Sequence, residues 1–169
     1  IKTTTIHELK TMLTKHVRGV IVYGTSGVGK SFSCRKLVKE LGYSLIYLSL
    51  SSVPHDTLVH TMAELSKILS DSKHKDVSTP NGAAQGGAKG KSTAVFIDDL
   101  HVLRESPAAL SVLCNTMDAV DRSIIFLGAV QKVSQVPDLL RRHGRYDHEI
   151  QFLPPSVDER ERILFDFYE

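Results

Sequence analysis

The chain has little cysteine, little net charge and no long hydrophobic run, and each shortage excludes a class of protein. Only two of its 169 residues are cysteines, Cys34 and Cys114, and they stand far apart without the CxxC spacing of a metal site. Both lie in apolar, helix-like surroundings, where buried free thiols are common. We therefore expect a reducing setting: the cytoplasm, the nucleus or the surface of an organelle. No apolar run approaches the roughly 20 residues that a transmembrane helix requires, and no signal-peptide pattern opens the chain.

The charge balance also excludes strong electrostatic partners. There are 21 basic and 19 acidic residues, and a net charge of +2 gives no field that would indicate nucleic acid or a membrane surface. With 41% apolar residues, a chain of this length can bury one substantial core, which fits a single domain or subdomain. Because the sequence starts at Ile1, we expect it to be part of something longer.

Short apolar runs alternate with helical periodicity along the chain, which is typical of an α/β protein with a mostly parallel sheet. Five strands are predicted, at Gly19–Tyr23, Ser44–Ser49, Ala94–Asp98, Ser123–Ala129 and His148–Leu153. Helices are predicted at Phe32–Leu41, after a cap at Asp56, from Ser106 and Pro107 to about Val120, and from a capping box of Ser156 and Glu159 toward Tyr168.

One segment, Ser72–Thr93, breaks this pattern, because it is rich in Gly, Ala, Lys and Ser and has no apolar face. We expect a flexible insertion, a mobile surface loop between a helix and the third strand. A solvated loop explains its four lysines, and contact with phosphates or a partner is the alternative.

The most informative motif matches GxxxxGK[ST] at every position, with Gly24, Thr25, Ser26, Gly27, Val28, Gly29, Lys30 and Ser31. It follows an apolar strand and opens a helical stretch, which is the context of a phosphate-binding loop. Its backbone N–H groups and the positive end of the new helix would face the phosphates of ATP. We expect Lys30 to contact the β and γ phosphates and Ser31 to ligate Mg²⁺. The alternative, a chance glycine-rich turn, does not explain eight matching positions.

A second motif is the apolar strand Val95–Ile97, which ends in two carboxylates, Asp98 and Asp99. Charge is excluded from a buried strand except at its end, where a cation can meet it, and this is the Walker B arrangement. We expect Asp98 to hold Mg²⁺ directly or through water, and Asp99 to polarise the attacking water. The alternative is an ordinary helix cap at the exit of a strand.

Together these blocks resemble the AAA family of hexameric ATPases. Arg18–Gly24 is similar to the RGVLLYG stretch that leads into the family's P-loop, and Leu140–Ile150 is similar to its LRRxGRxDxxI segment. The resemblance covers about residues 18–164 and implies a three-layer αβα P-loop fold with strand order 5-1-4-3-2. ATP would then bind at the carboxyl ends of the strands, with the chain as the family's large nucleotide-binding subdomain.

The resemblance also assigns roles to residues outside the loop. It implies that Arg142 and Arg145 are arginine fingers, which reach the γ-phosphate bound by a neighbouring subunit. The alternative is a basic turn. It places Gln131 at the family's sensor position, where a carboxamide can orient the attacking water; an ordinary polar residue at a strand exit is the alternative.

The chain departs from the family in three ways. Asp99 stands where the family usually has glutamate, and Ser51–Leu58 lacks the aromatic residue of the family's pore loop. We expect the helical lid with its second sensor to be absent or truncated after Tyr168. These losses resemble the weaker ring of two-ring members of the family.

Three functions therefore remain open. The leading one is an ATPase module of a ring that remodels proteins or complexes, with ring subunits and a protein substrate or adaptor as partners. The second is a structural module that holds ATP in a ring but hydrolyses it poorly. The third is an initiator, clamp-loader or dynein-like module, which the block from Arg142 to Asp147 disfavours.

Overall fold

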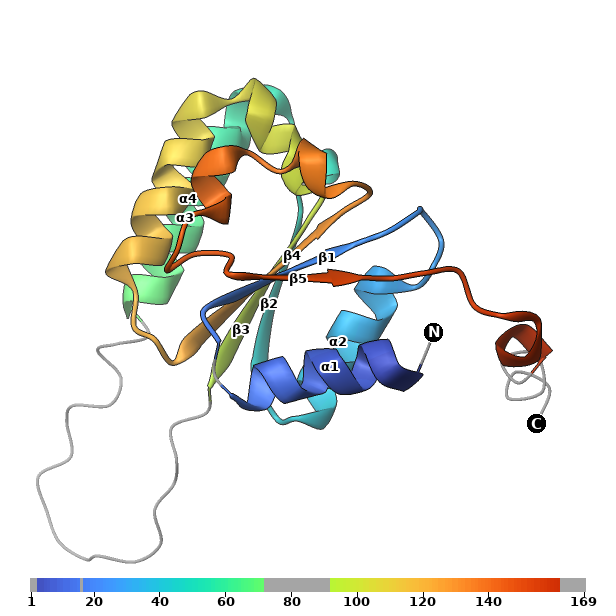
Figure 1. Cartoon of the computed structure of the whole chain (residues 1–169). Helices are drawn as coiled ribbons and strands as arrows, with labels where there is room; N and C mark the ends of the chain where they lie inside the picture. Colours follow the sequence, from blue (N-terminus) through green and yellow to red (C-terminus); the bar gives the residue numbers. More distant parts are fainter. Residues whose placement is uncertain (1–2, 16, 72–91, 162–169) are drawn as a thin grey trace, which may run out of the picture.

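The computed structural model describes residues 3–15, 17–71 and 92–161, which form a sheet covered by helices on both faces (Figure 1). The strands are β1 (Gly19–Tyr23), β2 (Ser44–Ser49), β3 (Thr93–Asp98), β4 (Ile124–Val130) and β5 (His148–Gln151). They lie in the order β2-β3-β4-β1-β5, and every neighbouring pair is parallel. The expected α/β class and strand order are therefore confirmed.

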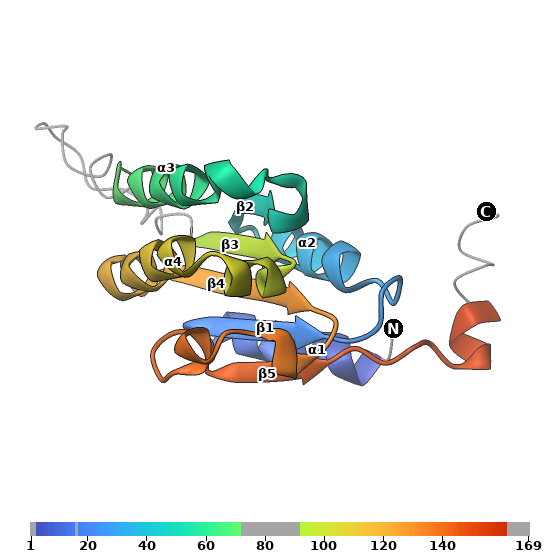
Figure 2. The same cartoon turned by 90° about the horizontal axis from the view of Figure 1, so that it is seen from above.

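The helices form two layers. One face of the sheet carries α1 (Thr3–Thr14) and α2 (Lys30–Glu40), and the other carries α3 (Leu58–Asp71) and α4 (Pro107–Ala119), as Figure 2 shows. Short 3-10 helices follow several strands: η1 (Leu50–Ser52), η2 (His55–Thr57), η4 (Leu100–Glu105), η5 (Val133–Gln135) and η6 (Asp138–Arg141).

Alternation of side chains along the strands divides the core in two. In β1, Val20 and Val22 pack with the α1 and α2 layer, whereas Ile21 packs with the α3 and α4 layer. In β4, Leu127 packs with the α1 and α2 layer and Phe126 with the α3 and α4 layer. Every residue of this central strand is buried. A parallel sheet with both faces covered requires this continuous apolar pattern, which is what made the strands recognisable.

Three strand boundaries differ from the prediction. β3 begins at Thr93, because the N–H of Ser44 donates to the carbonyl of Ser92 at 3.0 Å and starts the pairing there. The expected insertion at 72–93 therefore ends before Thr93, and its remainder lies outside the described residues apart from Ser92. β4 is displaced by one residue, and β5 stops at Gln151, which pairs with Tyr23, the last residue of its neighbour β1.

The helices also differ in places. α1 was not predicted, although Ile6, Leu9 and Leu13 repeat at helical spacing and the two leucines are fully buried. Asp56 does not cap α3; it lies inside η2, which turns the chain before α3 begins.

The other two predicted caps are confirmed. Ser106 accepts from the N–H of Ala109 at 3.4 Å, with Pro107 at the first position of α4. Ser156 and Glu159 form the reciprocal capping box, with 2.9 and 3.3 Å between the paired atoms, ahead of helical residues 157–161. The expected extension toward Tyr168 lies outside the described residues.

A single arginine fastens the end of α4 to the start of β1. The guanidinium of Arg18 donates to the carbonyls of Asp121 at 2.6 Å and Val120 at 3.0 Å, and also to that of Met117. The carbonyls of Met117 and Val120 lie at the carboxyl end of α4, where a helix leaves carbonyls without partners and a cation is favoured. The orientation of α4 against the sheet is therefore fixed by a charge as well as by packing.

Both cysteines are free and buried, as expected. Cys34 lies on α2 beneath the phosphate loop, and burial raises the pKa of its thiol to about 12. A thiol with such a pKa stays protonated and unreactive at neutral pH, so Cys34 acts as a small core residue.

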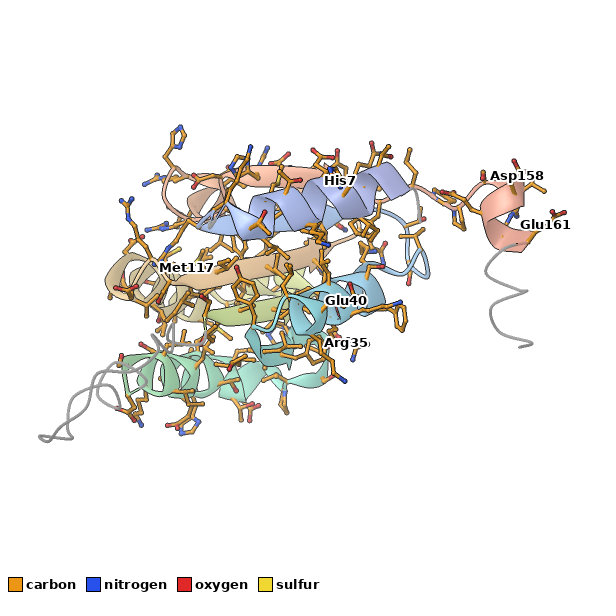
Figure 3. The ribbon with its side chains drawn as sticks, turned by 90° about the horizontal axis from the view of Figure 1, so that it is seen from below. His7, Arg35, Glu40, Met117, Asp158 and Glu161 are labelled. Carbon is orange, nitrogen blue, oxygen red and sulfur yellow. The ribbon has the colours of Figure 1, made fainter. Side chains whose placement is uncertain are left out.

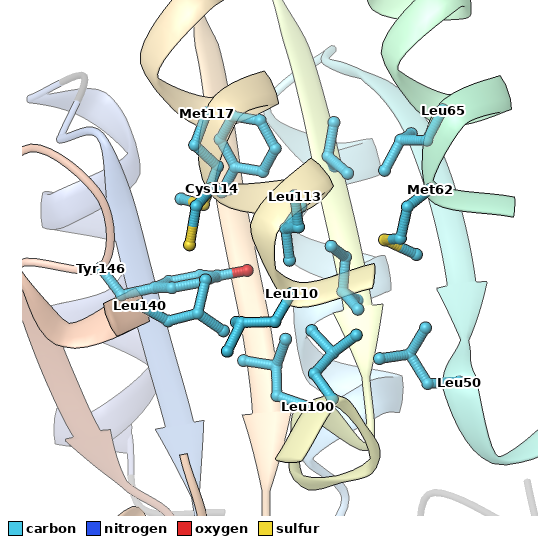
Figure 4. Close-up of a cluster of buried hydrophobic side chains, with 14 of the residues drawn as sticks. Leu50, Met62, Leu65, Leu100, Leu110, Leu113, Cys114, Met117, Leu140 and Tyr146 are labelled. Atoms are coloured by element: carbon cyan, nitrogen blue, oxygen red, sulfur yellow. The ribbon is translucent and has the colours of Figure 1, made fainter. Parts of the chain in front are cut away.

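Close packing at Gly128 generates a stability prediction. A Cβ added at Gly128 in β4 would meet Leu100 Cδ1 and would lie 3.2 Å from the ring of Tyr146, and both neighbours are buried (Figure 4). We expect Gly128→Ala to lower the free energy of unfolding by about 1–3 kcal/mol through overpacking. Denaturant unfolding of the variant measures this, and Leu100→Ala combined with Gly128→Ala should cost less than the sum of the two single changes. An additive result would show that the two side chains do not compete for space.

Candidate nucleotide site

A pocket of about 350 Å³ opens where the carboxyl ends of β1, β3 and β4 meet. It is lined by Ser26, Gly27, Gly29, Lys30, Ser31, Phe32, Asp98, Asp99, Val130 and Gln131. The structure thus brings together residues expected from three separate parts of the sequence. Gly24 and Thr25 line an adjoining pocket of about 250 Å³, and Val28 is buried beneath the loop.

The phosphate loop is shaped by backbone conformations that favour glycine. Gly24, Gly27 and Gly29 all have positive φ, and Gly29, at φ 88°, is the residue from which α2 starts. No side chain caps α2, so the N–H groups of its first turn face the pocket without helical partners. An uncapped helix end beside a turn of this kind is a site for an anion.

Lys30 supplies the positive charge of the pocket. Its Nζ donates to the carbonyls of Gly24 at 2.7 Å and Thr25 at 2.9 Å, so the side chain folds back over the loop. Burial lowers the pKa of Lys30, while the carboxylates of Asp98 and Asp99 oppose this shift. The ammonium is thereby held at the loop mouth, where the terminal phosphates of a nucleotide would lie.

Ser31 and Asp98 meet directly. The hydroxyl of Ser31 donates to Asp98 Oδ2 at 2.5 Å, and the hydroxyl of Tyr47 lies 3.4 Å from the same oxygen. A hydroxyl and a carboxylate at this separation supply the hard oxygen atoms that Mg²⁺ prefers, so the residues fit the expected ion. The ring centroid of Tyr47, on the edge strand β2, lies 5.1 Å from the guanidinium carbon of Arg35. Arg35 belongs to α2 and is labelled in Figure 3.

Asp99 has an unusual backbone. Its φ of 61° is the only positive value at a non-glycine residue in the described part of the chain. Its carboxylate accepts from the hydroxyl of Ser51 in η1 at 2.5 Å, and its N–H donates to Asp98 Oδ1 at 3.1 Å. The expected catalytic carboxylate therefore lines the pocket while paired with a residue from the segment after β2.

Gln131 lies at the end of β4 and lines the same pocket. Its backbone carbonyl accepts from the N–H of Gly24 at 3.2 Å, which joins the end of β4 to the first residue of the loop. Its exposed side chain is therefore placed next to the phosphate loop by a backbone contact.

The structure does not bring Arg142 and Arg145 to this pocket. Their segment precedes β5, whose first residue, His148, lies in register with Val20 near the start of β1. Both arginines are thus at the amino ends of the strands, on the opposite edge of the sheet. Arg142 is exposed, whereas Arg145 is largely buried and paired with Asp118 of α4.

Sequence reasoning missed Ser51, Tyr47, Phe32 and Asp118. The first two follow from the strand order, because the carboxyl end of β2 lies beside that of β3. Phe32 directly follows the loop motif and keeps 65% of its surface exposed at the pocket. No sequence signal indicated that Asp118 would meet Arg145.

Two further classes of site are absent from residues 3–15, 17–71 and 92–161. No group of three or more His, Cys, Asp and Glu residues there could hold a metal ion by itself. No helix within these ranges is both long and apolar enough to cross a bilayer.

Comparison with known proteins agrees with this geometry. The sequence profile of the ATPase family associated with various cellular activities (AAA) matches residues 20–153. The chain is 28% identical to Cell division control protein 48 homolog B of Arabidopsis thaliana, a match that covers 93% of this chain and 26% of that protein. It is 26% identical to ATPase family gene 2 protein homolog B of Mus musculus, which covers 87% of the chain and 20% of the relative. The chain thus spans about a quarter or less of the length of these relatives. Because the family profile matches most of its residues, the chain belongs to the AAA ATPase family.

Proposed function

We propose that the chain is the large nucleotide-binding subdomain of a ring-forming ATPase, which hydrolyses ATP to remodel proteins or complexes. The observation that carries this proposal is the contact between Ser31 and Asp98 at the mouth of the phosphate loop. Two oxygen ligands for Mg²⁺ meet there beside a lysine and an uncapped helix end, in a pocket at the carboxyl edge of a parallel sheet.

Each pocket residue has a task in this proposal. The loop amides and Lys30 bind and orient the phosphates. Ser31 and Asp98 would hold Mg²⁺, which supplies positive charge to the phosphate oxygens when bound. Asp99 orients and polarises the attacking water, and Gln131 assists by donating and accepting hydrogen bonds.

The position of Arg142 supports assembly into a ring. It lies on the edge of the sheet opposite its own pocket, so it can act only on nucleotide held by another subunit. A guanidinium suits the oxygens of a transferring phosphoryl group and adds charge that the pocket lacks. The proposed partners are therefore other ring subunits, together with a protein substrate or adaptor.

A second function, ATP binding that holds a ring together with little hydrolysis, is favoured by one observation. The carboxylate of Asp99 accepts a 2.5 Å hydrogen bond from Ser51, in the segment where the family's pore loop is expected. A carboxylate engaged in this way, on a side chain shorter than glutamate, is poorly placed to activate water.

Lys30→Ala tests nucleotide binding. We expect the affinity for ATP to fall about a hundredfold, because a charge-assisted contact to the phosphates is lost. Titration with a fluorescent nucleotide measures this, with Lys39→Ala, on the exposed last turn of α2, as the matched control. Unchanged affinity in Lys30→Ala would contradict the role of the loop.

Variants at Asp99 distinguish the two functions. Glutamate is longer than aspartate by one bond of about 1.5 Å, and a misplacement of about 1 Å can cost on the order of a hundredfold in rate. In single-turnover assays we expect Asp99→Glu to speed hydrolysis and Asp99→Asn to slow it, with little change in ATP affinity. Ser51→Ala, which frees the carboxylate, should also speed hydrolysis. If all four proteins hydrolyse ATP at the same negligible rate, the structural role replaces the enzymatic one.

Mixing variants tests action between subunits. Arg142→Ala and Lys30→Ala should each be inactive alone, because each removes one half of every composite site. Mixed assemblies contain some interfaces that pair an intact phosphate loop with an intact Arg142. We expect the mixture to regain part of the steady-state ATPase activity. Activity that does not depend on protein concentration, with no recovery on mixing, would refute the role in trans.

A further inference from the structure

The two arginines in the segment before β5 occupy different environments. Arg145 forms a two-pronged ion pair with Asp118 of α4: Nε lies 3.0 Å from Oδ1, and an Nη nitrogen lies 2.7 Å from Oδ2. Its remaining Nη nitrogen donates to the carbonyl of Leu139 at 2.5 Å. All three guanidinium nitrogens are therefore engaged within the same chain.

The arginine side of this pair is largely covered, whereas 53% of the Asp118 side chain is exposed. Only 15% of the Arg145 side chain is exposed, and its hydrogen bond lowers the pKa of Asp118 from the usual value of a carboxyl group. The next residue, Tyr146, is buried among Leu140, Cys114 and Leu110, and lies across the sheet in Figure 4. For Arg145 to reach another subunit, it would have to give up the hydrogen bonds of all three guanidinium nitrogens within its own chain.

Arg142 differs from Arg145 in its exposure and in its pairing. It is exposed, and none of the ion pairs found among the described residues includes it. Its neighbours have carboxylate partners: Arg141 lies 3.0 Å from Glu149, and the His143 ring lies 3.3 Å from Asp147. Of the three arginines at 141–145, Arg142 is therefore the one that no carboxylate in the described ranges holds.

A backbone contact links the two arginines. The N–H of Arg145 donates to the carbonyl of Arg142 at 3.2 Å, and the N–H of Tyr146 donates to that of Leu140 at 3.1 Å. The turn that carries Arg142 is thus closed by Arg145, whose side chain is fastened to α4. Any movement of Arg145 away from Asp118 would also displace Arg142.

From this geometry we propose that Arg142 alone acts as the arginine finger, and that Asp118 and Arg145 are positioning residues that set its direction. This inference rests on the proposed ATPase function and narrows the roles of the two arginines. It also gives Asp118 a role in catalysis although it contacts neither nucleotide nor phosphate. Asp118 and Arg145 would act by keeping the 142–145 turn at a fixed angle to α4.

Exchanging the two charges tests the proposal. In the assembled full-length protein, Arg145→Asp and Asp118→Arg should each lower kcat about a hundredfold through misplacement of Arg142, with little change in KM for ATP. The double variant restores an ion pair at the same place, so we expect its kcat to return to within about tenfold of the unchanged protein. A finger at position 145 would not be restored, because the guanidinium would then lie on α4. Recovery of the melting temperature without recovery of kcat would therefore overturn the proposal.

Two lysine variants provide a test that does not depend on correct folding of the charge-reversal variants. We expect Arg142→Lys to lower kcat by at least about a hundredfold with an unchanged melting temperature, because a finger contributes about 10³–10⁵ in rate. Arg145→Lys keeps a charge beside Asp118 but loses the two-pronged contact, so its kcat should fall, but less than that of Arg142→Lys. Equal losses of kcat in the two lysine variants would contradict the division of roles.

Failure of the proposed ATPase function can be distinguished from failure of the positioning role. If the unchanged protein shows no turnover in any assembled state, the ATPase proposal fails. The thermal unfolding of the unchanged protein, the two single charge variants and the double variant then still decides whether Asp118 and Arg145 form a pair, since coupled residues give non-additive changes in stability. Additive changes would remove the positioning pair altogether.

Discussion

The hydrogen bond between Ser31 and Asp98 joins two parts of the chain that are 67 residues apart, and the rest of the structure depends on that meeting. Ser31 lies in α2 directly after β1, and Asp98 ends β3, with β4 between the two strands. The contact therefore requires three parallel strands in register and a loop that brings α2 back over the sheet. Only with both in place do the hydroxyl of Ser31 and the carboxylate of Asp98 meet at one edge of the sheet.

Features with a local physical cause could be predicted from the sequence. The strand cores were visible because a sheet covered on both faces needs continuous apolar runs, as in Gly19–Tyr23. The caps at Ser106 and Ser156 were visible because a helix start requires an acceptor at a fixed spacing. The phosphate loop and Asp98 were expected at one edge, since strands of one direction place their carboxyl ends together. The order of the strands came from family resemblance and not from spacing.

Features that arise only from tertiary contacts could not be predicted in this way. Pairing of Ser51 with Asp99, and of Asp118 with Arg145, joins elements whose separation depends on the packing of helices and loops. No periodicity encodes such a meeting, because Ser51 in η1 and Asp118 in α4 are polar residues that would suit any exposed position. The left-handed backbone of Asp99 could not be predicted either, because the turn between β3 and η4 imposes it. The sequence alone therefore indicated residues that line the pocket, but not which of them are restrained by contacts with other side chains.

The strand order also bears on how the chain acquires its shape during synthesis. Both strand neighbours of β1 come from the last third of the chain, and Gly19 pairs with Phe126. A ribosome adds roughly 5–20 residues each second, so β1 waits at least about five seconds for β4. Until then β1 has an unpaired edge on each side, and such edges are open to wrong partners. The phosphate loop, which follows β1, is thus synthesised early, but β1 gains its neighbours β4 and β5 late. The nascent chain is therefore most exposed to wrong pairing at the strand that leads into this loop.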